Sequence, residues 1–169
     1  NKQTAIYSTD IPSDNYFKFL VEELKPYIDS AYATKSEMKN TFVAGSGMGG
    51  LISIYAICEY PKVFGGAACL STHWEGIFAS KNNPIPAAFV QYLSKHLPDP
   101  SIHYIYFDFG TAPSDSLYGT FQMQVDSVLQ VKGFDQNRWK SMKHEGANYS
   151  KRSWMKRLPI PVVYLLDKR

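Results

Sequence analysis

The chain has 169 residues, of which 44% are hydrophobic, 20% charged and 15% aromatic, a composition typical of one globular domain with a substantial core. Its formal net charge of +3 comes from scattered Lys and Arg residues, which excludes the concentrated basic surface of a nucleic-acid-binding protein. No apolar run reaches the roughly 18 residues of a membrane span, and no signal peptide is visible, although a processed or truncated start leaves the compartment open.

The first 40 residues predict a loop followed by one amphipathic helix. Residues 1–12 are polar and end in Pro12, and Ser13 or Asp14 is suited to cap the helix that follows. The apolar residues of this helix recur at helical spacing: Phe17, Leu20, Val21, Leu24 and Ile28. Pro26 is expected to kink the helix near its end.

From residue 41 onward, predicted strands and helices alternate. Strands are expected over residues 41–44, 64–71, 102–107 and 139–143, and helices over residues 51–60, 86–96, 117–131 and 150–158. Residues 108–110 are expected to close the third strand, and the apolar run 160–166 fits a helix or a strand. The alternation predicts an α/β fold with a parallel sheet flanked by helices, in a single domain over residues 1–169.

Several reactive side chains are predicted to serve structure alone. Cys58 and Cys69 fall on apolar segments and are expected in the core, without a disulfide framework. His96 and His103 are expected at the surface, and the basic cluster within residues 151–157 on a solvated helix face. No histidines and carboxylates have the spacing of a metal site, so neither a metal nor a cofactor is expected.

The most informative motif is Gly-Ser-Gly-Met-Gly-Gly at residues 45–50, between the first predicted strand and its helix. This is the layout of the nucleophile elbow, G-x-S-x-G, which presents a serine hydroxyl at the edge of an α/β-hydrolase sheet. Gly47 stands where that serine belongs, and Ser46 lies one residue too early to replace it. A phosphate-binding loop would require a Gly-Lys-Ser/Thr ending, which is absent.

Three segments together resemble the putative-esterase family of α/β-hydrolases, which includes esterase D-like, enterochelin-esterase-like and feruloyl or acetyl-xylan-esterase-like proteins. They are the elbow segment 41–53, the segment 106–115 that resembles the strand and loop of the catalytic acid, and the segment 146–154 that resembles the loop of the catalytic histidine. Their order matches the family's Ser, Asp, His order. The resemblance implies an α/β-hydrolase fold and a serine ester hydrolase parent.

Carried over position by position, the resemblance implies a catalytic triad that is broken twice. Gly47 occupies the nucleophile position and cannot form an acyl-enzyme. Tyr149 occupies the histidine position, and a phenol with an ordinary pKa of about 10 is a poor base at neutral pH. Asp115 is the acid candidate, or alternatively the N-cap of the next helix, with Asp108 a weaker choice. The backbone N–H of Met48 is the implied oxyanion donor.

Other residues near predicted strand ends are candidates for binding or for a replacement base. His73 and Trp74 follow the second strand, where α/β folds place ligand-contacting loops, so they are expected to line a binding pocket. The alternative is a loop histidine held by packing. His144 lies on or beside the last strand, either as a stand-in base or as an edge-strand residue without a catalytic role.

The chain is short for the fold that it resembles. Only 46 residues precede Gly47, whereas the family places several more strands and one oxyanion loop there. We therefore expect the C-terminal two-thirds of the fold, without its N-terminal strands. The predicted function is an inactive esterase-like domain, a pseudoenzyme or binding module for a small ester or carbohydrate. The alternatives are a truncated or disabled serine hydrolase of acylated sugars or siderophore-type esters, and one part of an assembly completed by a second chain or a homo-oligomer.

Overall fold

The computed structural model describes residues 13–76, 82–112 and 118–167, and the chain divides into two compact units, residues 1–36 and 37–169. In the first unit, α1 (Ser13–Lys18), the π-helical segment η2 (Phe19–Leu24) and α2 (Lys25–Ala31) follow one another without a break. Pro26 stands in the first turn of α2, and the preceding turn is widened so that the Lys25 N–H bonds to the Leu20 carbonyl. Proline lacks an N–H and crowds the carbonyl four residues earlier, which explains why the helix type changes next to Pro26. The kink expected near the end of the helix stays a prediction.

The second unit is built on a four-stranded parallel sheet in the order β1 (Phe42–Ser46), β2 (Gly66–Leu70), β3 (Tyr104–Gly110) and β4 (Trp139–His144). This confirms the α/β fold with a parallel sheet. β3 continues through Asp108 to Gly110, past its predicted end, because these residues pair with Met142, Lys143 and His144 of β4. A short 3₁₀ turn, η3 (Met38–Asn40), precedes β1.

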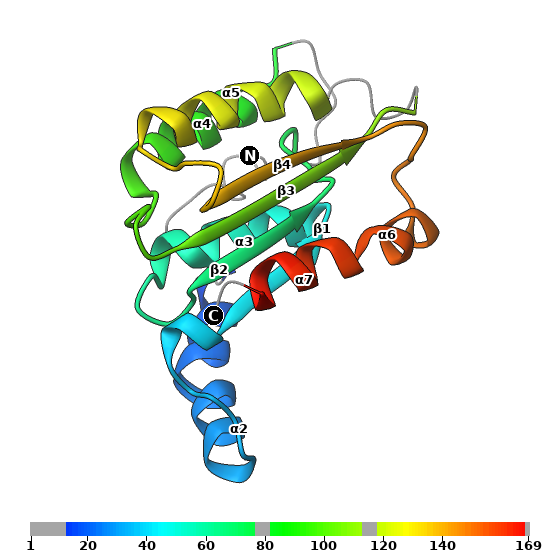
Figure 1. Cartoon of the computed structure of the whole chain (residues 1–169). Helices are drawn as coiled ribbons and strands as arrows, with labels where there is room; N and C mark the ends of the chain where they lie inside the picture. Colours follow the sequence, from blue (N-terminus) through cyan, green and yellow to red (C-terminus); the bar gives the residue numbers. More distant parts are fainter. Residues whose placement is uncertain (1–12, 77–81, 113–117, 168–169) are drawn as a thin grey trace. The chain divides into compact units, whose positions relative to one another are not determined.

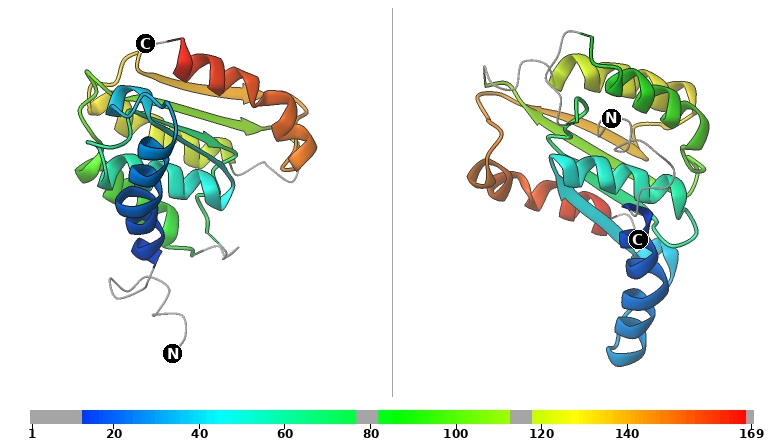
Figure 2. Two further views of the ribbon diagram at one scale, coloured as in Figure 1. Left: turned by 90° about the horizontal axis from the view of Figure 1, so that it is seen from below. Right: turned by 180° about the vertical axis from the view of Figure 1, so that it is seen from behind.

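Helices cover both faces of the sheet (Figures 1 and 2). One face carries α3 (Met48–Glu59), α4 (Ile85–His96) and α5 (Tyr118–Val131), and the other carries α6 (Lys151–Arg157) and α7 (Pro159–Leu166). The apolar run 160–166, which fitted a helix or a strand, is thus part of helix α7, with Pro159 in its first turn and Leu165 packed against the sheet. Prolines are tolerated there because the first N–H groups of a helix have no partner within it.

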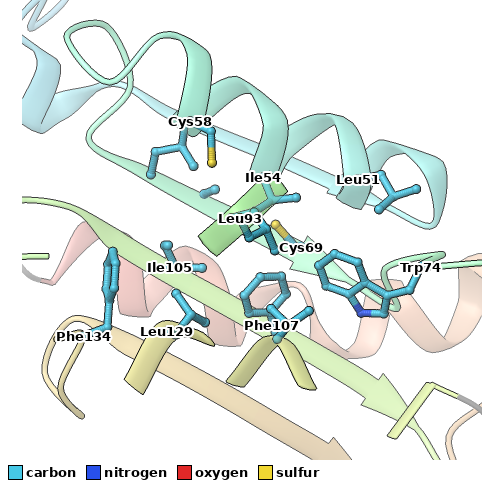
Figure 3. Packing of buried hydrophobic residues seen from close by; sticks show 13 residues of the cluster. Leu51, Ile54, Cys58, Cys69, Trp74, Leu93, Ile105, Phe107, Leu129 and Phe134 are labelled. Carbon is cyan, nitrogen blue, oxygen red and sulfur yellow. The ribbon is translucent and has the colours of Figure 1, made fainter. Parts of the chain in front are cut away.

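The main hydrophobic core lies between the sheet and the helices α3, α4 and α5 (Figure 3). Ile54, Ile57, Ile105 and Phe107 are completely buried in it. Cys58 and Cys69 belong to the same core as free thiols, which confirms their predicted structural role. Burial raises the pKa of Cys58 to about 12, which disfavours its reactive thiolate form.

One predicted surface histidine is buried. His103 precedes β3 and is only 2% exposed, so its expected surface position was wrong, whereas His96 is exposed as predicted. The ring nitrogens of His103 lie 2.9 Å from the Asp99 carbonyl oxygen and 2.8 Å from the Pro61 carbonyl oxygen. The second partner is 42 residues away in sequence, which is why local pattern did not reveal the burial.

Candidate functional site

The turn between β1 and α3 has the backbone geometry of a strained elbow. Gly47 has φ 61° and ψ −119°, a combination outside the left-handed helical region and costly for any residue with a side chain. Its N–H donates to the Leu70 carbonyl, and its own carbonyl accepts from the N–H groups of Gly50 and Leu51. A Cβ on Gly45 would collide with the backbone of Gly49, so the flanking glycines permit the tight passage from strand to helix.

Tyr149 fills the space above this turn. A Cβ added to Gly47 would overlap the Tyr149 hydroxyl and lie 3.0 Å from the ring carbon that bears it. Gly47 and Tyr149, the two residues that the family resemblance assigns to the nucleophile and histidine positions, are therefore in direct contact in the fold, although they are 102 residues apart in the sequence. Gly47 is buried, whereas Tyr149 is 41% exposed, so the phenol separates the elbow from solvent.

An aromatic group, consisting of His73, Tyr118, Tyr149 and Trp154, is centred on Tyr149 beside the elbow. The Tyr149 ring lies 5.9 Å from His73, 6.0 Å from Tyr118 and 4.8 Å from Trp154, measured between centroids. These residues come from the loop after β2, the start of α5, the loop after β4 and helix α6. The His73 N–H also donates to the Gly47 carbonyl at 3.2 Å, which fastens its loop to the elbow.

Trp74, expected beside His73 in a pocket, lies in the hydrophobic core. It is 2% exposed and packs against Phe89 and Phe107. Its indole N–H donates to the Gln122 side-chain oxygen at 3.1 Å, which satisfies the one polar atom of the ring. Of this neighbouring pair, only His73 faces the elbow.

A buried ion pair lies at the same end of the sheet. The Asp108 side chain is fully buried, and its Oδ1 lies 3.3 Å from Arg157 Nη2, while its Oδ2 lies 3.8 Å from His144 Nε2. Burial raises the pKa of Asp108, and the Arg157 and His144 charges oppose that rise. Burial also lowers the pKa of His144, against the attraction of Asp108. His144 therefore faces a buried carboxylate.

Arg157 is 4% exposed, so its predicted place on a solvated helix face was wrong. Its Nη2 also donates to Ser71 Oγ at 2.9 Å, and the Trp154 indole N–H donates to the same oxygen at 3.2 Å. Ser71 has φ 43°, and its N–H bonds to the carbonyl and the carboxylate of Asp108. Sequence reasoning missed Ser71 and Arg157, although the spacing of Trp154 and Arg157 places both on one face of α6.

The remaining predicted site features are only partly described. Asp115 lies in the segment 113–117, outside the described residues. Met48 begins α3, so its N–H is one of the donors that a helix leaves unbonded at its start. Within the described ranges, no cluster of three or more His, Cys, Asp or Glu residues is arranged to hold a metal ion. In the same part of the chain, no helix combines the length and apolarity needed to cross a membrane.

Comparison with known proteins agrees with this fold. A family model described as "Putative esterase" matches residues 8–159, while no curated protein matches the chain. A ferulic acid esterase structure superposes with TM-score 0.72 at 15% identity, covering 91% of this chain and 61% of that one. Enterochelin esterase from Shigella flexneri superposes with TM-score 0.66 at 17% identity, covering 92% of this chain and 37% of that one. S-formylglutathione hydrolase from Staphylococcus aureus superposes with TM-score 0.66 at 15% identity, covering 90% of this chain and 61% of that one.

Each of these three comparisons covers less than two thirds of the other protein's length. At such low identity, the similarity shows a shared fold and carries no substrate from one protein to another.

Proposed function

Because the chain belongs to the family described as "Putative esterase", we propose that it is an esterase-fold domain without serine-hydrolase turnover, which acts as a pseudoenzyme or as a binding or structural module. The elbow and the parallel sheet of the fold are present. The reactive hydroxyl at position 47 and the histidine base at position 149 are not.

The observation that carries this proposal is the contact between Gly47 and Tyr149. A serine at position 47 would need the space that the Tyr149 hydroxyl occupies, so the two departures from the family pattern fit each other. Glycine also relieves the strain of the elbow, which enzymes accept to expose a nucleophile. A knockout of an otherwise intact enzyme would need only one of these changes, since losing a second triad member costs little further activity.

For a ligand, we propose a small ester or a carbohydrate that rests on the aromatic group. The names of two similar structures, a ferulic acid esterase and an enterochelin esterase, support an ester as the ligand. The alternative proposal is that this chain is a disabled form of a hydrolase that acts on acylated sugars or siderophore-type esters.

The decisive test is multiple turnover of p-nitrophenyl acetate with substrate in large excess over protein. We expect no steady-state rate above that of buffer containing a folded control protein with four histidines. A saturable steady-state rate that disappears on substitution of His73 or His144 would contradict the proposal and identify a replacement base.

A second candidate function is that of one part of a larger sheet. β1 pairs with β2 on one side only, and its other edge has no strand partner among the described residues. Open strand edges recruit further strands, so a second polypeptide or another copy of the chain is a suitable partner. Size-exclusion chromatography with mass determination distinguishes the cases, since a stable monomer with cooperative unfolding would contradict this candidate.

A further inference from the structure

We propose that the Tyr149 hydroxyl is an acyl-accepting site: it stands in for the missing serine of the elbow and takes the acyl group of an activated ester in one stoichiometric transfer. This inference rests on the proposed function only in that no further turnover is expected after the transfer.

The first argument is position. The phenolic oxygen lies where the side chain of residue 47 would begin, at the point to which the elbow directs its reactive atom. Tyr149 is 41% exposed as a whole residue, so its side chain forms part of the surface over the elbow and lies within reach of an ester from solvent. The elbow thus still presents a hydroxyl group, supplied by another segment of the chain.

The second argument concerns the groups around that oxygen. Met48 begins the 12-residue helix α3 directly after Gly47, the residue that the phenol contacts, and an N–H at a helix start can stabilise an oxyanion. The His73 ring lies beside the Tyr149 ring, and its backbone is bonded to Gly47. Trp154 contacts the phenol edge-on and limits its motion. The elbow and the rings beside it therefore contribute a hydroxyl as nucleophile, a helix N-terminal N–H as oxyanion donor and an imidazole as proton acceptor.

The chemistry of the transfer balances without a cofactor. The phenolic oxygen attacks the ester carbonyl carbon, and the phenolic proton passes to the His73 imidazole. The C–O bond to the leaving group breaks, and the departing oxygen takes up that proton, or leaves as a stable phenolate while the proton passes to solvent. The product is an aryl ester on Tyr149. The family's water-activating base position is Tyr149 itself, so this ester is expected to persist.

The exposed tyrosines of the same chain provide an internal comparison. Tyr27 and Tyr32 are each 64% exposed, more than Tyr149. If exposure alone governed acylation, these two would react faster. If the elbow assists, Tyr149 should react at least about tenfold faster than either, since one oxyanion donor alone is worth about 10²–10³ in an intact enzyme.

The experiment treats the whole chain with p-nitrophenyl acetate near pH 7.5 and follows acetylation of each tyrosine by peptide mass spectrometry. We expect one equivalent of p-nitrophenol in a burst and a hydroxylamine-sensitive acetyl group on Tyr149. Acetylation of Tyr149 no faster than that of Tyr27 and Tyr32 would overturn the inference.

Variants separate assistance from accessibility. Tyr149→Phe should remove the burst, whereas Tyr32→Phe should leave it unchanged. Gly47→Ala should displace the hydroxyl and bring Tyr149 to the rate of Tyr27, and His73→Gln should slow the burst several-fold. A burst that survives in Tyr149→Phe would overturn the inference. Steady-state turnover after the burst would instead contradict the proposed function. In that case, the presence or absence of the acetyl group on Tyr149 would still decide whether Tyr149 accepts the acyl group.

Discussion

The Tyr149 hydroxyl occupies the place where a side chain on Gly47 would begin. Positions 47 and 149 are therefore one structural unit, and a substitution at either is expected to depend on the residue at the other. A glycine without a side chain and a tyrosine whose hydroxyl fills the vacancy are mutually compatible. A serine and a tyrosine at these two positions are not.

We predict that Gly47→Ser destabilises the fold by about 1–3 kcal/mol, because it adds a side chain at a strained φ of 61° and displaces the phenol. In a Tyr149→Ala background, the same substitution should cost less by at least about 0.5 kcal/mol, since the overlap is gone and only the backbone strain remains. Urea unfolding of the four proteins of this double-mutant cycle measures the difference. Additive effects would mean that the two residues do not share this space.

Restoring the family residues should restore a little chemistry. Gly47→Ser combined with Tyr149→His replaces the overlapping pair by a serine and a shorter imidazole, and should give more esterase activity than either single variant. Activity should remain well below that of an intact enzyme, because each missing oxyanion donor typically costs about 10²–10³ in rate. Labelling with a fluorophosphonate probe measures the new nucleophile. No gain over the parent chain would show that the positions were carried over wrongly from the family.

The sequence predicted the architecture well because local patterns determine it. Alternating apolar strands and amphipathic helices indicated all four strands of the sheet, and the glycines at 45–50 indicated the elbow. Residues whose burial depends on distant partners were missed. Arg157 is buried because Ser71 and Asp108, 86 and 49 residues earlier, provide its acceptors. Nor could any local signal show that Tyr149 lies directly over Gly47.

The ion pair of Asp108 and Arg157 is predicted to behave as a coupled unit. Arg157→Met should cost about 3–5 kcal/mol, because it leaves a buried carboxylate without its cation. Adding Asp108→Asn should recover at least about 1 kcal/mol of that loss, since no uncompensated charge remains. Asp126→Asn is the matched control: Asp126 is half-buried and hydrogen-bonded to Gln122 and Ser141, so its loss leaves no cation unpaired. Thermal and urea unfolding measure the stability of these variants. A double variant less stable than Arg157→Met alone would contradict the coupling.

The pH dependence of stability should depend on His144. Because burial lowers its pKa below the ordinary 6.5, the unfolded chain binds a proton here before the folded chain does. The stability contributed by neutral His144 is complete above pH 6.5 and is lost as the pH falls through the lowered pKa. Asp108 has the opposite sign, because its raised pKa favours the folded chain as the pH falls towards 3.8. Between pH 7 and 5, His144→Gln should therefore lose less stability than the parent chain, measured by urea unfolding at several pH values. His96→Gln, at an exposed helix end, should retain the parent slope, and equal slopes in all three proteins would contradict the assignment to His144.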